Sequence, residues 1–417
     1  MTDYCLKGAR LIDPGQELDE IRDLTIAKGK ITFAAPDKST ELLDFREKII
    51  MPGLVDVRGH LQDPESLASA SKAAASGGYT TLLIMPNSDA PADNPGAVHL
   101  MREKASKNSQ VDILQCGCLT KGAKGKVLAP LGSLKEAGVV AVSDCPQSPQ
   151  DTEIFARGLE YASMFDLPVI EFPRDRAISS RGVAHDGPVA LKMGIGGYPR
   201  MAEELFVQRA ITVCKNLGTK IHLTSVSSVG SVELIREAKA KGISVTADST
   251  PHHLALTDDC LIGYDANSKT MPPLREEIDR KAILEGIMDG TIDCVISAHE
   301  PCQKHEKEVE FDLAPAGVIG YETAISVVLG ELRKITNDPF PLIARVMSLN
   351  PSRLLGIKNI IAEGNVANLF VFDPDKVWTY DVNAGNSAAK NSPYHGFEMN
   401  GSVLTTFSNG EKVYTYS

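Results

Sequence analysis

The sequence lacks several features that mark specialised classes of protein. No apolar run is long enough to cross a membrane, and the first residues do not follow the charged, apolar and small order of a signal peptide. Basic residues form no dense run of the kind that follows a phosphate backbone, and the net charge is −11. We therefore expect a cytoplasmic protein that binds neither membranes nor nucleic acid.

Cysteine is present without the spacing of a disulfide framework or a metal motif. The 417 residues contain eight cysteines, and none forms a Cys-x-x-Cys pair. The rest of the composition is ordinary, with 43% hydrophobic and 23% charged residues. A chain of this length and balance buries a large core, and we expect one large domain with one small one.

The middle of the chain alternates short apolar runs with amphipathic helical stretches, which is typical of strand–helix units around a parallel sheet. Helices are predicted over residues 150–164, 202–216 and 231–241. No Gly-rich phosphate-binding turn follows the first run, which argues against an open doubly wound sheet. The pattern predicts an α/β fold, a (β/α)8 TIM barrel. Its eight strands are expected at residues 54–57, 80–85, 112–118, 138–143, 168–172, 220–226, 244–248 and 293–297.

Both ends of the chain are rich in short strands and turns. The expected strands are residues 4–12, 23–27, 31–34 and 367–373, followed by a closing hairpin around residues 408–411. Each end is too small to fold alone. We therefore expect residues 1–50 and 358–417 to form one small β-sandwich domain, and residues 51–357 to form the barrel.

Catalytic side chains of such barrels project from the C-terminal ends of the strands. A metal-dependent amide hydrolase needs His and carboxylate ligands there, because the metal lowers the pKa of bound water from about 16 toward 7. Few such ligands are present. Arginine offers no lone pair, and Phe and Ala bind no metal, so His60 and Asp144 are the remaining candidates. The residues at these ends are Arg58, His60, Gln62, Asp144, Cys145, Glu171, Phe172, Arg174, Thr224, Ser225, Ala298, His299, Glu300 and Cys302.

Several motifs spread along nearly the whole chain carry a resemblance to a known family. They are Met51-Pro52-Gly53-Leu54-Val55-Asp56, Gly77-Gly78-Tyr79-Thr80-Thr81, Met85-Pro86-Asn87, Pro251-His252-His253-Leu254, Pro272-Pro273-Leu274-Arg275, Asp289-Gly290-Thr291-Ile292-Asp293 and Asn350-Pro351-Ser352-Arg353-Leu354-Leu355-Gly356. Together they resemble dihydroorotase, the cyclic-amide hydrolase of pyrimidine biosynthesis in the amidohydrolase superfamily. Each motif alone is weak, but the set is specific.

The resemblance implies that most of the family's functional residues have changed in this chain. The implied metal-ligand positions hold Arg58, His60, Asp144 or Cys145, Phe172, Ser225 and Ala298. The implied general base is replaced by Ala298, and the implied substrate-contact positions hold Gln62, Asn87, Met271, Arg275 and Cys302. Among the ligands, His60 is retained and Asp144 is compatible with retention. We therefore expect no catalytic residue and no metal cofactor.

The replacements predict a noncatalytic dihydroorotase homologue, present as a homodimer or in a mixed oligomer. The resemblance also implies a partner, since some bacteria pair an inactive dihydroorotase-like chain with aspartate carbamoyltransferase. Two alternatives remain. One is an active dihydroorotase or other cyclic amidohydrolase with a rearranged or one-metal zinc site. The other is a small-anion binding protein with its ligand near Arg58, Asn87 and Arg275.

Arg58 has a physical explanation as a compensating residue. A site that has lost its cations retains unpaired negative charge and a polar void, and both are costly in a protein interior. Arg58 is expected to return a positive charge close to Asp144, while Phe172 fills volume. A nucleophile and base assembled from Cys145, Cys302 and His299 is a further arrangement, although no oxyanion site is evident in the sequence.

Overall fold

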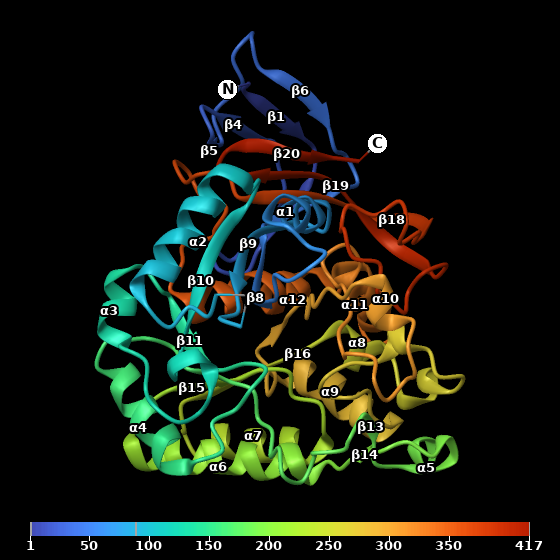
Figure 1. Cartoon of the computed structure of the whole chain (residues 1–417). Coiled ribbons are helices and arrows are strands. Elements are labelled where there is room, and N and C mark those ends of the chain that lie inside the picture. The colour runs from blue at the N-terminus through green and yellow to red at the C-terminus, as the bar shows by residue number, and fades with distance from the viewer. Residues whose placement is uncertain (1, 88–89, 417) are drawn as a thin grey trace.

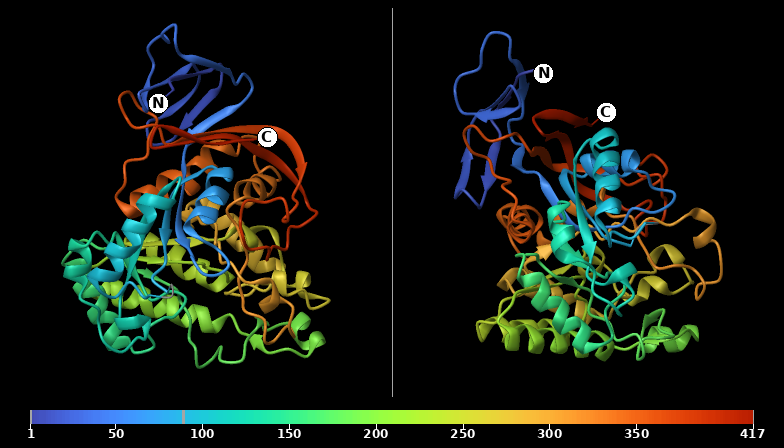
Figure 2. Two further views of the ribbon diagram at one scale, coloured as in Figure 1. Left: turned by 45° about the horizontal axis from the view of Figure 1, so that its top comes forward. Right: turned by 60° about the vertical axis from the view of Figure 1, so that its left-hand side comes forward.

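The structure is a computed structural model that describes residues 2–87 and 90–416. Figure 1 shows a β-rich part, which holds both chain ends, above a larger part in which helices lie outside several strands. The N-terminal and C-terminal strands stay side by side in the two turned views of Figure 2. The two ends of the chain therefore build one body.

The β-rich part consists of two sheets, with the strand orders β5-β4-β1-β6 and β20-β19-β18-β7-β2-β3. Their strands are β1 (Tyr4–Lys7), β2 (Arg10–Asp13), β3 (Leu18–Ile21), β4 (Leu24–Ala27), β5 (Lys30–Thr32), β6 (Glu41–Asp44), β7 (Ile49–Pro52), β18 (Leu369–Thr379), β19 (Glu398–Ser408) and β20 (Glu411–Thr415). Leu6 and Ile26 of one sheet share a buried apolar cluster with Ile50 and Phe407 of the other. The predicted β-sandwich is confirmed.

The strand predicted over residues 4–12 is in fact two strands. Gly8 separates β1 from β2 with a φ of +70°, and a Cβ at this residue would lie 2.6 Å from Cγ of Arg46. Glycine adopts this conformation without strain, whereas a side chain here would also collide with Arg46. The turn sends β1 and β2 into different sheets.

The larger part contains eight parallel strands in two four-stranded arcs, β11-β10-β9-β8 and β12-β15-β16-β17. A parallel bridge between Val142 and Val169 joins one pair of arc ends. At the other pair, the backbone N–H of His60 donates to the carbonyl oxygen of His299 at 3.0 Å. The ring is closed, and the predicted TIM barrel is confirmed. Its strands are β8 (Leu54–Gly59), β9 (Tyr79–Ile84), β10 (Asp112–Cys118), β11 (Ala141–Ser143), β12 (Ile170–Glu171), β15 (Ile221–Leu223), β16 (Val245–Ser249) and β17 (Cys294–Val295).

Helices cover the outside of the barrel, and the three predicted ones correspond to α4, α6 and α7. Side-chain caps fix where two of them begin, because Asp151 accepts hydrogen bonds from the first turn of α4 and Ser228 does so for α7. The helices are α1 (Leu67–Ser76), α2 (Pro95–Asn108), α3 (Leu131–Glu136), α4 (Thr152–Ser163), α5 (Pro188–Met193), α6 (Met201–Leu217), α7 (Val229–Ala240), α8 (Pro251–Ala255), α9 (Glu277–Asp289), α10 (Lys304–Lys307), α11 (Ala324–Leu332), α12 (Phe340–Ala344) and α13 (Asn350–Leu355). A short pair of strands, β13 (Ala184–His185) and β14 (Gly197–Tyr198), lies in the connection after β12.

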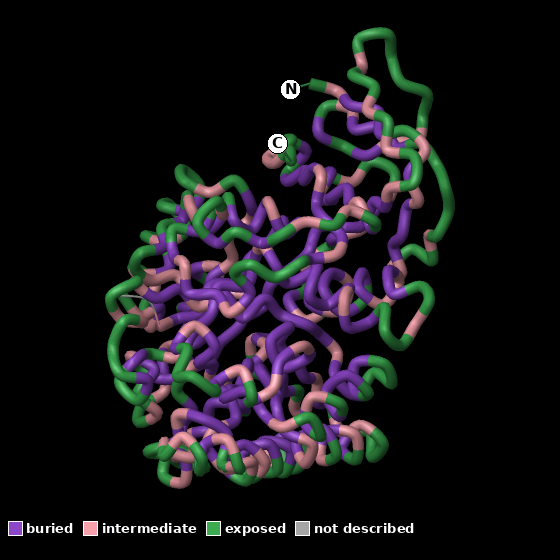
Figure 3. The backbone as a smooth tube through the Cα atoms, turned by 90° about the vertical axis from the view of Figure 1, so that its right-hand side faces the viewer, coloured by how far each residue is buried: buried purple, intermediate pink, exposed green. Residues whose placement is uncertain are grey.

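The sandwich and the barrel share part of their core. Phe372 of β18 and Val403 of β19 belong to the same buried cluster as Leu54 and Tyr79 of the barrel strands. Figure 3 shows the buried backbone concentrated in the middle of the larger part, with exposed segments at its outer helices and at the tip of the β-rich part. The proposed domain boundaries at residues 50 and 357 stay a prediction. Within residues 2–87 and 90–416, no helix combines the length and apolar character needed to cross a membrane.

Candidate functional site

The C-terminal ends of the barrel strands meet around the side chain of Arg58 on β8, which is 1% exposed. Its Nη1 donates to Oγ of Ser225 at 2.9 Å, and its Nε donates to Sγ of Cys145 at 3.3 Å. Its Nη2 lies 3.5 Å from Oε2 of Glu300, and its Cζ lies 5.3 Å from the ring centroid of Phe172. One arginine thus connects the segments at the ends of β11, β12, β15 and β17.

The positions around Arg58 are those that the resemblance assigns to metal ligands. Cys145, Phe172 and Ser225 all contact the guanidinium. A guanidinium stays protonated and has no lone pair, so it cannot bind a metal. It brings a fixed positive charge into the middle of the ligand positions, as a compensating residue is expected to do.

Asp144 is engaged elsewhere. Its carboxylate accepts hydrogen bonds from the backbone N–H of Thr120 at 2.9 Å and from the Thr120 hydroxyl. Burial raises the pKa of this carboxyl group to about 6. Within the part of the chain that the structure describes, Arg58 contacts Cys145 at this strand end rather than the expected Asp144.

Cys145 is not an activated nucleophile. Burial raises the pKa of its thiol to about 11, although the positive charge of Arg58 opposes the shift. A thiol with this pKa is almost fully protonated at pH 7, and only the thiolate attacks or binds a metal. Burial also raises the pKa of Cys302 to about 11. The arrangement of a cysteine nucleophile with His299 therefore has no support from the electrostatics.

His60 retains its implied position and is fixed in one tautomer. Its Nδ1 lies 2.9 Å from Oδ1 of Asn87, an acceptor, so Nδ1 carries the proton. The Nε2 atom is buried and has no hydrogen-bond partner among the described residues. Burial, together with the nearby charge of Arg58, lowers the pKa of His60 to about 4. The ring is neutral at pH 7 and offers a single lone pair.

Apolar side chains surround the charge of Arg58. Cys145, Phe172 and Ala298 belong to one buried cluster in the barrel interior, and Met271 packs against it. All four residues stand at positions that the resemblance assigns to ligands, the general base or a substrate contact. Apolar side chains therefore stand at several positions where the resemblance implies polar, reactive groups.

The backbone has an unusual conformation at two of the positions that the resemblance assigns to metal ligands. Ser225 has a φ of +60° and Ala298 has a φ of +51°, both in the left-handed region that side chains other than glycine rarely adopt. Such residues cluster at functional sites, where the strained backbone aims a side chain. Sequence patterns give no signal for this feature, because neither residue is one that favours the left-handed region.

The remaining implied substrate contacts already have partners inside the protein. Nε2 of Gln62 donates to the carbonyl oxygen of Pro301 at 2.7 Å. The guanidinium of Arg275 donates to the carbonyl oxygen of Tyr198 at 2.9 Å and to Oγ of Ser227 at 3.1 Å. These contacts hold both side chains against the barrel itself.

A second cluster of ligand-type residues, which the sequence did not reveal, lies beside β13 and the start of α9. Ligand atoms of His185, Glu276 and Asp279 lie within 4.8 Å of one another. The guanidinium Nη2 of Arg200 lies 2.6 Å from a carboxylate oxygen of both Glu276 and Asp279. Arg275 donates to Nδ1 of His185 at 3.3 Å. Two arginines thus occupy the cluster and supply its positive charge.

The donor set at the barrel strand ends does not fit a zinc ion. Catalytic zinc needs three protein ligands of the His, Cys or carboxylate type and one open position. The implied positions supply one neutral imidazole and one protonated thiol, while Asp144 is bound to Thr120. The fixed charge of Arg58 would also repel a cation. The absence of the family's metal stays a prediction.

The chain is similar to known proteins along its whole length. Residues 47–231 match a family model described as dihydro-orotase-like, and residues 192–413 match that of the amidohydrolase family. A protein named dihydroorotase from Endomicrobium trichonymphae is 38% identical, covering 98% of this chain and 99% of its own. Another of that name, from Pelotomaculum thermopropionicum, is 39% identical over 98% of this chain and 97% of its own.

Solved structures share the fold. The L-hydantoinase (dihydropyrimidinase) from Arthrobacter aurescens superposes with a TM-score of 0.87 at 23% identity, covering 99% of this chain and 96% of its own. The dihydropyrimidinase from Brevibacillus agri superposes with a TM-score of 0.84 at 20% identity, covering 99% of this chain and 95% of its own. At these identities the likeness supports the barrel and the sandwich alone.

Proposed function

We propose that this chain, which belongs to the dihydroorotase family of the amidohydrolase superfamily, is a cytoplasmic, noncatalytic member of that family. We further propose that it serves as a structural partner of aspartate carbamoyltransferase in pyrimidine biosynthesis. The observation that supports the first proposal is the buried guanidinium of Arg58, which touches three of the implied metal-ligand positions.

Hydrolysis of a cyclic amide needs a water activated at neutral pH and a group that accepts its proton. Ala298, at the position of the implied general base, accepts no proton. His60 accepts one through Nε2, but its pKa of about 4 makes it a weak base at pH 7. Phe172 and Met271, which belong to or pack against one apolar cluster, offer no hydrogen-bonding group of the kind that would orient a cyclic amide.

The proposed partnership with aspartate carbamoyltransferase rests on the resemblance and on the complete fold of the chain. The closed barrel and its sandwich persist although the reacting groups are replaced, so the protein's use lies in its surfaces. All eight cysteines are free, which agrees with a reducing compartment such as the cytoplasm.

Metal analysis and turnover test the noncatalytic proposal. The purified chain is expected to hold far less than one zinc per chain and to show no hydrolysis of dihydroorotate after zinc is added. Any trace of turnover is expected to persist unchanged in a His60→Gln variant. Such a result would show that the turnover comes from a contaminating enzyme. Stoichiometric zinc together with turnover that this variant abolishes would refute the proposal.

Co-elution tests the partner. The chain and the aspartate carbamoyltransferase from the same cells are mixed and run on a size-exclusion column, with each protein alone as the reference. A shared peak of larger mass than either reference is expected. Two separate peaks at micromolar concentration would refute the partnership and leave the noncatalytic proposal untouched.

A further inference from the structure

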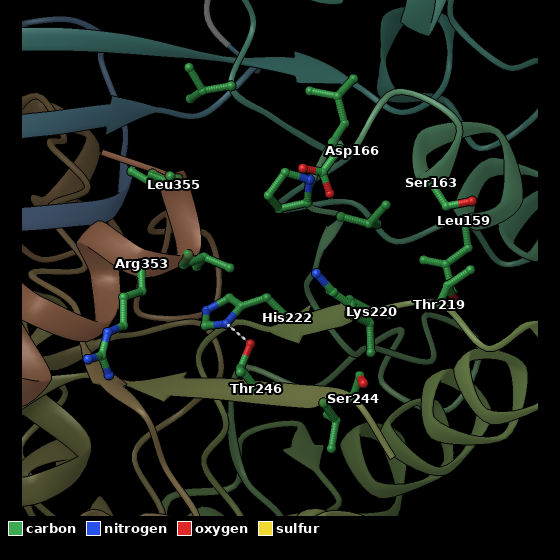
Figure 4. Close-up of a pocket in the computed structure, with 18 of the residues that line it drawn as sticks. Leu159, Ser163, Asp166, Thr219, Lys220, His222, Ser244, Thr246, Arg353 and Leu355 are labelled. Atoms are coloured by element: carbon green, nitrogen blue, oxygen red, sulfur yellow. Dashed lines mark hydrogen bonds between the residues drawn. The ribbon is translucent and has the colours of Figure 1, made fainter. Parts of the chain in front are cut away.

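A cavity of about 920 Å³ opens at the end of the barrel opposite to Arg58. Its walls come from the starts of five barrel strands and from α13 (Figure 4). Ile221, Val245 and Cys294 are the first residues of β15, β16 and β17, and Val140 and Val169 directly precede β11 and β12. The dihydroorotase resemblance assigns no functional residue to this end of the barrel.

Positive charge is in excess around this cavity. Lys135, Lys220 and Arg353 line it, and each is exposed. Within residues 2–87 and 90–416, none of the three side chains forms a hydrogen bond or an ion pair of its own, so their charges are free to act on a ligand. Unpaired cations that face a shared concave surface attract anions, because the low-dielectric walls focus the field.

Two carboxylates also line the cavity, and they differ in whether another side chain pairs with them. Asp293 is already paired, since its Oδ2 lies 2.6 Å from Nζ of Lys239 and accepts a hydrogen bond from the N–H of Ala247 at 2.8 Å. Asp166 faces the cavity from the loop after α4, as Figure 4 shows. Three unpaired cations therefore stand against one unpaired carboxylate.

The inner wall of the cavity is rigid and partly apolar. His222 is 1% exposed, and its Nδ1 lies 2.9 Å from Oγ1 of Thr246 while its Nε2 lies 2.8 Å from Oδ2 of Asp248. Both ring nitrogens are engaged, so the ring presents a fixed surface. Apolar side chains such as Leu354 and Ile221 extend this surface. Ligand sites of this size commonly combine apolar walls with a few polar groups that fix orientation.

We propose that this cavity binds a small organic anion, a cyclic or aromatic molecule that carries a carboxylate, sulfonate or phosphate group. The apolar walls take its ring, and Lys220 and Arg353, on opposite sides of His222 in Figure 4, take its charge. The site is separate from the family's reaction centre and does not depend on the proposed function.

The test uses 8-anilinonaphthalene-1-sulfonate, which joins an aromatic body to one sulfonate and fluoresces more strongly in an apolar site. The full-length protein is expected to bind it, and the affinity should fall when salt is raised from about 0.05 M to about 0.5 M. The double variant Lys220→Ala/Arg353→Ala is expected to bind at least about tenfold more weakly. Ser244→Trp, which places a large ring at a lining residue, is expected to abolish this component of binding.

Lys241→Ala is the matched control, since this exposed lysine pairs with Glu237 on α7 and does not line the cavity. The control should bind like the unchanged protein. Thermal unfolding of each variant shows whether it is folded, and the replaced lysine and arginine are exposed, so folding should persist. Affinity within twofold of the unchanged protein in the folded double variant would overturn the proposal, as would binding that is independent of salt.

Discussion

At the scale of single residues, the stability of the candidate site depends on the buried charge of Arg58. A charge buried at 1% exposure loses its hydration, and its hydrogen bonds to Ser225 and Cys145 and its ion pair with Glu300 offset that cost in part. A buried pair of this kind is a weak source of net stability, but breaking it is expensive. Removal of the cation leaves Glu300 with a charge that has no partner at this site.

Replacement of Arg58 by histidine is therefore expected to destabilise the protein by about 3–5 kcal/mol. Arg58→Lys keeps the charge but loses the planar fork, and an intermediate loss is expected. Arg157→His is the control, because Arg157 forms an exposed pair with Glu153 that contributes about 0.3–0.5 kcal/mol. Urea unfolding measures all three. An Arg58→His variant as stable as the control would remove the compensating role.

His252 gives the protein a predictable dependence on pH. Its ring is buried, stacks on Tyr394 with 5.7 Å between centroids, and has Nδ1 3.1 Å from the tyrosine hydroxyl. Burial, with smaller contributions from His253 and Arg58, lowers the pKa of His252 to about 3. The unfolded chain therefore binds more protons than the folded one between about pH 6.5 and pH 3. As the pH falls through this range, protonation of His252 in the unfolded chain lowers the free energy of unfolding.

A His252→Phe variant keeps the ring and lacks this titration. When the pH is lowered from 7.5 to 5, the free energy of unfolding of this variant should rise by about 2 kcal/mol relative to that of the unchanged protein. His99→Phe, at an exposed residue of α2, is the matched control and should follow the unchanged protein. Urea titrations at several pH values give the comparison. Parallel curves for His252→Phe and the unchanged protein would show that His252 is protonated in the folded state as easily as in the unfolded one.

At the scale of secondary-structure elements, the ends of the barrel strands carry the site. Ser225 follows β15 and Ala298 follows β17, and both turn the chain with a positive φ. The left-handed conformation costs a residue with a Cβ about 1–2 kcal/mol, so the strain must be balanced by the packing around it. The positive φ stands at two positions that the resemblance to dihydroorotase assigns to metal ligands.

Ala298→Gly is expected to cost less than the same change elsewhere. Ala247 on β16 is the matched control, because it is also buried but lies in an ordinary strand. Both variants lose one buried methyl group and gain flexibility in the unfolded state, and only Ala298→Gly relieves strain. The difference in unfolding free energy should be about 1–2 kcal/mol in favour of Ala298→Gly. Equal losses would show that the backbone at Ala298 is unstrained.

At the scale of the whole molecule, the sandwich and the barrel depend on one another. β18 pairs with β7, the strand that leads into the first barrel strand, and Phe372 and Val403 complete the barrel's buried cluster. The interface is part of a core rather than a contact between finished domains. The two parts should therefore unfold together.

Truncation tests this dependence. A chain ending at residue 357 loses β18, β19 and β20 and should show no cooperative thermal unfolding by circular dichroism. A chain ending at residue 410 loses only β20, the edge strand of its sheet, and should stay folded with a lower melting temperature. A cooperative transition in the shorter chain would show that the barrel folds alone.

The sequence predicted most of the architecture, because hydrophobic periodicity is local. The alternation of apolar runs with helical stretches gave eight strands, and the expected run at residues 112–118 coincides with β10. The pattern does not predict the split at Gly8, since apolar residues stand on both sides of this glycine and do not show where the chain passes from one sheet into the other. The proposed loss of metal ligands rests on residue identity alone, because Arg58 and Phe172 have no atom that binds a metal.

The chain by itself determined the family, the barrel and the sandwich, together with the residue types that stand at the positions implied by the resemblance. Only the tertiary structure decided what those residues contact. It placed Cys145 rather than Asp144 against Arg58, gathered Phe172, Met271 and Ala298 into one apolar cluster, and opened a basic cavity at the far end of the barrel. These contacts join residues that are far apart in the chain, so they depend on how the strands close into a ring.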